Sequence, residues 1–240
     1  MNSERTRFKR ILLKLSGEAL SAKSDAIDPQ TILRVAREIK SAHDLGVQIA
    51  IVIGGGNIFR GLRAVDYRMD RVVADHMGML ATVINALALG GALQTVGLEA
   101  QVMSAIEMRG VAEPFVRDAA INYLEDNRVV IFGGGTGNPY FTTDTAATLR
   151  ASEIGANALL KATKVDGVYD ADPVKVPGAK RFDTLSYGEV IEKGLRAMDL
   201  TAISLAMEQK IPIVVFNLLK GGNILKAVAG ERVGTIIRGE

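Results

Sequence analysis

The sequence contains no cysteine and only two histidines, His43 and His76, among its 240 residues. Without cysteine the chain forms no disulfide, no thiolate nucleophile and no zinc–sulfur site. Two histidines so far apart in sequence argue against a histidine-rich metal site and against Ser-His-Asp hydrolysis. Chemistry must therefore come from lysine, arginine, aspartate, threonine and backbone amides, a set that suits phosphoryl transfer.

An excess of one charge sign is also lacking. The 29 Lys and Arg residues nearly balance the 27 Asp and Glu residues, so no strongly basic surface indicates a nucleic-acid partner. We interpret the basic cluster Arg5, Arg7, Lys9 and Arg10 as a solvated N-terminal arm. The charged start, with only a short apolar run at 11–13, is not typical of a signal peptide.

One long stretch, 77–93, is nearly all apolar. Thr82, Asn85 and two glycines within it, together with its charged flanks, argue against a membrane span. A helix that is apolar all round is buried in a core or in a subunit interface. We therefore expect a cytoplasmic, oligomeric protein without a membrane segment.

Short β-branched runs alternate with longer segments of helical periodicity, the pattern of an α/β fold with a mainly parallel sheet. We treat the chain as one domain, since no Pro/Gly/Ser-rich linker divides it. The predicted strands are 10–15, 47–53, 101–104, 128–132, 158–162 and 213–217. The first predicted helix begins at Asp28 and Pro29 and ends before Gly46. The other predicted helices are 70–93, 114–126, 143–154, 186–193, 199–210 and 222–229.

An apolar strand that runs into three glycines occurs twice, at 52–56 and at 131–135. The spacing between the two is too long for a solenoid repeat. Ligands of open α/β sheets bind beyond the carboxyl ends of the strands. We therefore expect two strands that end side by side and deliver two glycine-rich loops to one crevice.

A lysine at the end of the first predicted strand precedes a glycine turn. The segment is Lys14-Leu15-Ser16-Gly17-Glu18. This arrangement places an ammonium group beside backbone N–H groups, which suits a polyphosphate. For this segment alone, a surface lysine on a loop is an equally good interpretation.

The first glycine triplet is followed by an arginine. The segment is Gly54-Gly55-Gly56-Asn57-Ile58-Phe59-Arg60-Gly61. Glycines let the backbone approach a phosphate, a helical turn from Asn57 would add its positive end, and Arg60 can fork onto phosphate oxygens. A tight turn with an exposed arginine is the weaker interpretation. The chain has neither a Walker loop nor a complete Gly-x-Gly-x-x-Gly fingerprint, which argues against Walker-type kinases and Rossmann dehydrogenases.

The second triplet opens a loop of small, polar and aromatic residues. Thr136, Asn138 and Thr143 supply neutral groups able to contact a base or sugar, and Thr142 can cap the following helix. Asp144 lies in the first turn of that helix. It is either a partner of the helix dipole or a group that orients a lysine or organises magnesium near the transferring phosphate.

The fourth segment runs from Lys161 to Pro173. Asp166-Gly167 is a turn signal, Tyr169 can pack on an adenine, and Asp172 precedes a proline. On spacing alone, an acidic surface turn is favoured. The stretch 165–183 is the longest irregular one and is a candidate nucleotide lid.

Together the four segments resemble the bacterial uridylate (UMP) kinases of the amino-acid kinase superfamily, over nearly the whole chain. The resemblance also covers the sequence RVVADHMGMLAT at 71–82 and Met198-Asp199-Leu200. The motifs KLSG, GGGNxFRG, DHMGML and TGNPxFTTD are highly specific in combination. The motif KATKVDGVY alone would indicate only the superfamily.

This resemblance implies a three-layer α/β/α fold and the reaction ATP + UMP → ADP + UDP with Mg²⁺. It implies a phosphate and UMP lobe at about 1–155, an ATP nucleoside lobe at about 156–240, and a hexamer with 77–93 as an interface. Transfer would be in line, to a phosphate oxygen that needs no strong general base. Lys14, Arg60, backbone amides and Mg²⁺ would relieve the repulsion between the two anions.

The resemblance also implies roles for individual residues. The catalytic residues would be Lys14, Arg60 and Asp144. The ATP side would comprise Lys14, Leu15, Ser16, Gly17, Gly56, Arg60, Thr163, Tyr169 and Asp172. The UMP side would comprise Gly55, Asp75, Thr136, Gly137, Asn138, Pro139, Tyr140, Phe141, Thr142 and Thr143, with Asp75 suited to ribose hydroxyls. Asp199 is either a helix cap or a carboxylate near the site, and the metal ligands stay open.

Two departures from the family concern regulation. Many members carry Gly-Phe-Gly before the first helix, where this chain has Ser24-Asp25-Ala26 and is one residue shorter. Gln94 and Gln101 stand where some relatives have basic residues associated with GTP. Activation by GTP and inhibition by UTP are expectations from the family.

Two alternatives remain open. One is another kinase of the superfamily that phosphorylates a carboxylate or carbamate, although the 136–144 loop with Asp75 matches the nucleotide-acceptor branch. The other is a regulatory module that binds uridylates without turnover. The presence of Lys14, Arg60 and Asp144 argues against the second alternative.

Overall fold

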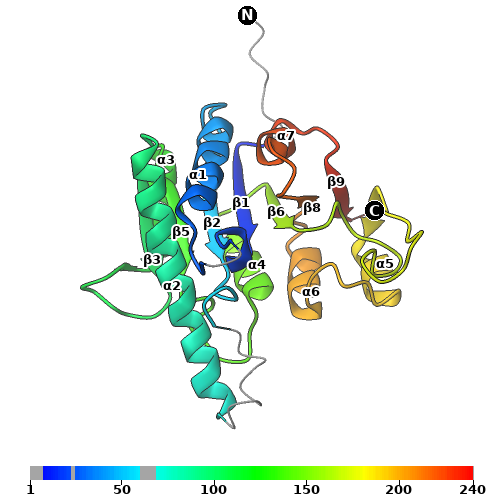
Figure 1. The fold of residues 1–240 in the computed structure, drawn as a ribbon, viewed down its shortest axis with the longest axis horizontal. Coiled ribbons are helices and arrows are strands. Elements are labelled where there is room, and N and C mark those ends of the chain that lie inside the picture. Colours follow the sequence, from blue (N-terminus) through cyan, green and yellow to red (C-terminus); the bar gives the residue numbers. More distant parts are fainter. Residues whose placement is uncertain (1–7, 23–24, 60–68, 240) are drawn as a thin grey trace, which may run out of the picture.

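One mixed sheet spans the chain (Figure 1). The computed structural model describes residues 8–22, 25–59 and 69–239, so Arg5, Arg7, Ser24 and Arg60 lie outside the described residues. The strand order in the sheet is β4-β3-β5-β2-β1-β6-β8-β9-β7, and neighbours are parallel except β8 and β9. The strands are β1 (Arg10–Leu15), β2 (Gln48–Ile53), β3 (Ala100–Ser104), β4 (Glu113–Pro114), β5 (Val129–Gly133), β6 (Ala158–Thr163), β7 (Thr184–Ser186), β8 (Ile213–Asn217) and β9 (Gly234–Arg238).

Helices cover both faces of the sheet because its central strands are apolar on both sides. In β1, the side chains of Ile11 and Leu13 pack with α1, α2 and α7, whereas Leu12 packs with α3 to α6. The predicted three-layer α/β/α fold is thereby confirmed. The helices are η1 (Gly17–Ala19), α1 (Pro29–His43), α2 (Arg71–Thr95), α3 (Arg117–Glu125), α4 (Thr143–Glu153), α5 (Tyr187–Glu192), α6 (Leu200–Glu208) and α7 (Asn223–Ala229).

All the predicted strands and helices are present, with ends shifted by a few residues. The largest shift concerns the helix predicted over 114–126. It begins at Arg117, because Glu113 and Pro114 pair with β3 as strand β4. Strands β4, β7 and β9 were not predicted, since short strands of this kind are defined by tertiary pairing more than by propensity.

Local capping residues behave as the sequence predicts. The Asp28 side chain accepts a hydrogen bond from the Thr31 backbone N–H at 2.7 Å, and Pro29 follows at the first helical position of α1. The Thr142 hydroxyl accepts from the backbone N–H groups of Asp144 and Thr145 at 3.0 and 3.3 Å. Each such cap satisfies N–H groups that have no partner inside the helix, at about 1 kcal/mol per cap.

Helix α2 is the one described helix whose length and composition match a membrane span. Its inward side chains, Ala86 and Leu89 among them, belong to the core beside β2 and β5, so α2 is a core helix on that face. The opposite face carries an exposed apolar stripe at alternating spacings of four and three. The stripe consists of Val73, Met77, Leu80, Ile84 and Leu87.

Candidate active site

The carboxyl ends of β1, β2 and β5 lie side by side. Lys14 of β1 pairs with Val52 of β2, and Val52 pairs with Phe132 of β5. The two glycine triplets therefore leave neighbouring strands, as predicted. Since these strands are parallel, both loops emerge at the same edge of the sheet.

A carboxylate lies between two lysines at this edge. Lys14 and Lys161 are direct partners across the parallel pair β1–β6. Asp144, in the first turn of α4, places Oδ1 at 3.0 Å from the Lys14 Nζ and Oδ2 at 2.7 Å from the Lys161 Nζ. The Lys161 ammonium also donates to the Ala197 carbonyl at 2.7 Å. Together these contacts hold both ammonium groups in fixed positions.

The electrostatics of the three side chains are coupled. Burial opposes ionisation of Asp144, but the charges of Lys14 and Lys161 outweigh burial and lower the pKa of its carboxyl. Burial lowers the pKa of the Lys161 ammonium; the attraction of Asp144 partly offsets this, and the like charge of Lys14 adds to it. Two cations and one anion leave a net positive charge in a partly desolvated position, which attracts a polyphosphate.

Lys161 has no assigned role in the sequence-based prediction, although it lies in the KATKVDGVY motif. The sequence signal that identifies it is positional: a lysine inside a mainly apolar strand that pairs with the strand of Lys14. That signal becomes usable only once the β1–β6 register is known.

The first glycine loop is packed tightly between β1 and α2. The Gly54 backbone N–H donates to the Leu15 carbonyl at 2.9 Å. A Cβ on Gly17 would lie 2.1 Å from the Asn57 Oδ1, and a Cβ on Gly55 would lie 2.8 Å from the Ala81 Cβ. Ser16 precedes η1 with no side-chain cap bond. The predicted phosphate-side segment Lys14–Gly17 therefore lies directly against the loop that carries Gly55 and Gly56.

The turn after this triplet agrees with the predicted helical turn near Asn57. The N–H groups of Ile58 and Phe59 both donate to the Gly55 carbonyl, which makes one hydrogen-bonded turn. Arg60 follows outside the described residues.

The second loop reaches Asp75 of α2. The Tyr140 backbone, at a φ of 73°, donates its N–H to the Asp75 Oδ2 at 2.7 Å. The Arg71 Nε lies 2.9 Å from both Asp75 oxygens. The loop between Gly135 and Tyr140 turns on itself, with the Asn138 N–H donating to the Thr136 hydroxyl at 3.2 Å. Gly137 and Pro139 lie in this turn, while Phe141 is exposed and Thr143 begins α4.

Asp199 combines the two roles that its sequence position allowed, a helix cap and a carboxylate near the site. Its Oδ1 accepts the Ala202 N–H at 2.9 Å, so Asp199 is the cap of α6. The same carboxylate also accepts hydrogen bonds from the hydroxyls of Thr142 and Thr145. Asp199 therefore links the start of α6 to the start of α4. The linked residue Thr142 lies two residues before Asp144 in the sequence.

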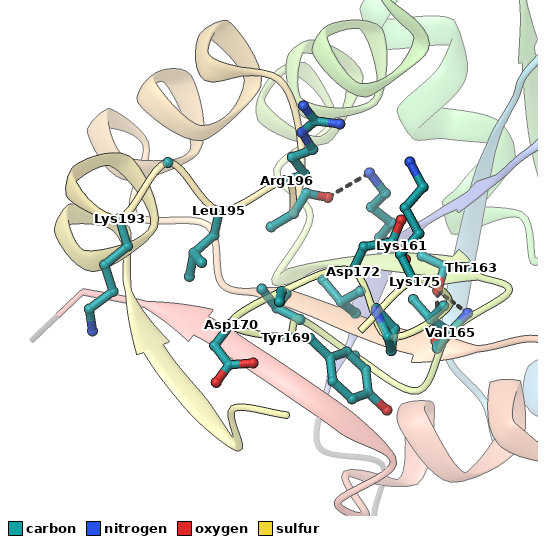
Figure 2. Close-up of a pocket in the computed structure, with 17 residues that line it drawn as sticks. Lys161, Thr163, Val165, Tyr169, Asp170, Asp172, Lys175, Lys193, Leu195 and Arg196 are labelled. Atoms are coloured by element: carbon teal, nitrogen blue, oxygen red, sulfur yellow. Dashed lines mark hydrogen bonds between the residues drawn. The ribbon is translucent and has the colours of Figure 1, made fainter. Parts of the chain in front are cut away.

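A cavity of about 560 Å³ adjoins Lys161 at the end of β6 (Figure 2). Thr163, Tyr169 and Asp172, the predicted ATP nucleoside residues, all line it, and so does Lys161. The first part of the stretch 165–183, from Val165 to Lys175, forms one wall of this cavity. Its base is fixed to β9, because the Val168 N–H donates to the Thr235 hydroxyl at 2.8 Å.

Comparison with known proteins places the chain in a family. The sequence model of the amino acid kinase family matches residues 9–217, so the chain belongs to that family. Within it, the chain is 55% identical over 236 residues to the uridylate kinase of Pediococcus pentosaceus, and the match covers 98% of each protein.

Solved structures agree with the sequence match. The UMP kinase of Bacillus anthracis is 41% identical with a TM-score of 0.93, over 96% of each chain. The UMP kinase of Ureaplasma parvum is 37% identical with a TM-score of 0.92, over 97% of this chain and 99% of its own. The resemblance to bacterial uridylate kinases that the sequence motifs indicate is confirmed.

Proposed function

We propose that this chain is a UMP kinase, which transfers the γ-phosphoryl group of ATP reversibly to UMP and releases UDP and ADP. The observation that carries the proposal is the Lys14–Asp144–Lys161 arrangement at the edge where both glycine loops emerge. The match to uridylate kinases over nearly the whole chain supports UMP as the acceptor.

The proposed mechanism is direct transfer between two bound anions. Lys14 and Lys161 stabilise the charge on the transferring phosphoryl group, and Asp144 keeps both ammonium groups in place. Arg60 and the backbone N–H groups of the loops add further positive potential. The attacking UMP oxygen belongs to a phosphate that is already ionised, so no general base is needed.

The two nucleosides would bind on opposite sides of this centre. The ATP base would stack on Tyr169 in the cavity beside β6, near Thr163 and Asp172. UMP would bind between α2 and the 136–143 loop, with Asp75 accepting from its ribose hydroxyls. Because Arg71 now contacts the same carboxylate, the ribose would compete with that exposed ion pair.

Magnesium would accompany ATP. Mg²⁺ in such sites is held by one or two carboxylates together with substrate phosphates. Asp144 fits this role, because its Oδ1 is buried and accepts no directed hydrogen bond, despite the nearby Lys14 charge. When bound, the ion would neutralise charge on the donor phosphates.

The exposed stripe of α2 supports assembly. Residues 73, 77, 80, 84 and 87 follow the spacing of a helix–helix seam, and they are 37–50% exposed in the single chain. We infer that a second copy covers this stripe within a hexamer. GTP activation, UTP inhibition, a cytoplasmic location and a role in pyrimidine nucleotide biosynthesis belong to the same proposal. Analytical ultracentrifugation of the protein and of the Leu80→Asp variant, which should dissociate, tests the assembly.

A coupled assay of ADP release tests the function. UMP, CMP, dTMP and acetylglutamate are supplied in turn as acceptors with Mg-ATP. We expect turnover with UMP well above that with the others. Turnover with acetylglutamate alone would identify a carboxylate kinase, and UMP binding without ADP release would identify a uridylate sensor. Either result would refute the proposed activity.

A further inference from the structure

Helix α2 contains one asparagine that is wholly buried. Asn85 is 0% exposed and lies in the otherwise apolar run between Val83 and Leu89. Burying an amide without partners costs a few kcal/mol, so a residue of this kind needs hydrogen bonds to be tolerated. In Asn85, every amide hydrogen is used.

Asn85 and Asn57 form a reciprocal amide pair. The Asn85 Nδ2 donates to the Asn57 Oδ1 at 2.7 Å, and the Asn57 Nδ2 donates to the Asn85 Oδ1 at 3.0 Å. The second hydrogen of Asn85 goes to the Gly54 carbonyl at 2.7 Å, and that of Asn57 goes to the Ala26 carbonyl at 2.6 Å. Because each Nδ2 also faces a carbonyl, rotating either amide by 180° would set two oxygens against each other.

The pair joins three segments at the edge of the sheet where both glycine loops emerge. It holds the Gly54–Asn57 turn to α2 and to Ala26, in the segment before α1. It also fills the space beside Gly17, where a Cβ would lie 2.1 Å from the Asn57 Oδ1. One helical turn earlier, the Thr82 hydroxyl accepts the Gly134 N–H at 2.8 Å. The same face of α2 therefore holds both glycine triplets.

The bond to the Gly54 carbonyl sets the direction of one peptide plane. In a trans peptide the C=O and the following N–H point in opposite directions, and the described chain has no cis peptide. With its oxygen directed to α2, the Gly54–Gly55 peptide directs the Gly55 N–H away from the α2 layer. The opposite layer is the side of α4, which carries Asp144, the partner of Lys14.

We propose that Asn85 and Asn57 are positioning residues for phosphoryl transfer, acting as a bridge that aims the Gly55 N–H at the transferring phosphate. This proposal rests on the UMP kinase activity proposed above. Neither side chain needs to touch a nucleotide. Because the base and ribose contacts lie on other loops, losing the bridge should lower kcat and leave both KM values nearly unchanged.

The test compares Asn85→Leu, Asn57→Ala and the double variant with Asn157→Ala. Asn157 is a matched control, since its Oδ1 accepts the N–H groups of Lys9 and Arg10 at 3.0 and 2.8 Å, at the opposite end of β1. Folded fractions come from urea unfolding, and kcat is expressed per folded molecule. Asn57 lies on a partly exposed turn, so Asn57→Ala keeps the test open if Asn85→Leu does not fold.

We expect kcat to fall by about tenfold or more in each bridge variant, with KM for ATP and UMP within about threefold of wild type. The double variant should be no worse than the poorer single variant, because the two residues act as one unit. Wild-type kcat per folded molecule in Asn57→Ala, with lowered stability only, would overturn the proposal. An inactive wild-type enzyme would instead refute the proposed function.

Discussion

The two glycine triplets share a sequence but need glycine for different physical reasons. Gly54, Gly55 and Gly56 are absent from the residues with positive φ, and Gly55 is required for space against Ala81 and Gly78. In the second triplet, Gly134 and Gly135 have φ values of 77° and 59°, so there the backbone conformation itself favours glycine.

This difference separates two tasks. The first loop is pressed between β1 and α2, where close approach fixes it beside Lys14. The second loop uses its left-handed residues to turn sharply from β5 towards Asp75. We conclude that the first triplet needs glycine for close packing beside Lys14, whereas the second needs it for the turn from β5 towards Asp75.

The largest effect is expected at the centre that both loops serve. Lys161→Met and Lys14→Ala should each lower kcat by about 10²–10³-fold. Each substitution removes a fixed positive charge that stabilises the negative charge developing on the phosphoryl group. Steady-state kinetics with UMP measures the loss, and Lys226→Met on the exposed face of α7 is the control. If Lys161→Met turned over at the wild-type rate, the centre would be purely structural.

Gly55→Ala should have the next largest effect. The added Cβ would lie 2.8 Å from both the Ala81 Cβ and the Gly78 carbonyl oxygen, so the loop must move. A shift of about 1 Å in such a loop lowers kcat by about 10²-fold. Ala81→Gly in the same chain removes one of these contacts and should restore part of the rate. A Gly55→Ala enzyme with normal kcat would show that the close packing is unimportant.

The pH dependence should distinguish the lysine centre from both loops, whose backbone amides do not titrate. Burial lowers the Lys161 pKa from its ordinary 10.5, so kcat should fall as pH rises through the lowered value. The free energy of unfolding should change in the opposite direction. Between the lowered pKa of Lys161 in the folded state and its ordinary pKa in the unfolded state, the unfolded chain binds more protons. The contribution of Lys161 to the free energy of unfolding therefore rises with pH. Lys161→Arg should move the fall in kcat to higher pH. If the pH profile of kcat were unchanged by that substitution, Lys161 would be excluded as the group whose deprotonation causes the fall.

Gly135 offers the smallest and most diagnostic effect. A Cβ there would meet nothing closer than the Met79 Cγ at 3.7 Å, so only the φ of 59° opposes a side chain. Gly135→Ala should cost about 1–2 kcal/mol of unfolding free energy, and Gly135→Asn less, since asparagine tolerates this conformation. At Gly55 the order should reverse, with asparagine worse than alanine. Urea unfolding of the alanine and asparagine variants at Gly135 and at Gly55 measures the order of stability at each position. If alanine and asparagine ranked in the same order at both positions, the two triplets would not need glycine for different reasons.

Much of this fold follows from local sequence signals. The strand that carries Lys14, the cap at Asp28 and the cap at Thr142 are all predicted from apolar runs and the polar residues beside them. Strand β9 was not predicted from the sequence. Its antiparallel pairing with β8 depends on a chain reversal that no local sequence pattern indicates.

The site divides in the same way. The glycine triplets and the 161–173 segment are visible as motifs, but the pairing of Lys161 with Lys14 depends on the β1–β6 register. Asn85 illustrates the same limit. In the sequence it is a polar residue that argues against a membrane span, and its bonds to Gly54 and Asn57 exist only across a distance of 28 to 31 residues along the chain.

Direct phosphoryl transfer from ATP to UMP is tested by following the phosphoryl group itself. The protein is incubated with ATP labelled at the γ-phosphorus, Mg²⁺ and UMP, and the products are separated, with Lys161→Met in parallel. Direct transfer to UMP predicts label in UDP, in equal amount to the ADP formed, and very little label in the UDP formed by the variant. Label released as inorganic phosphate, or label in UDP at the wild-type rate from Lys161→Met, would contradict it.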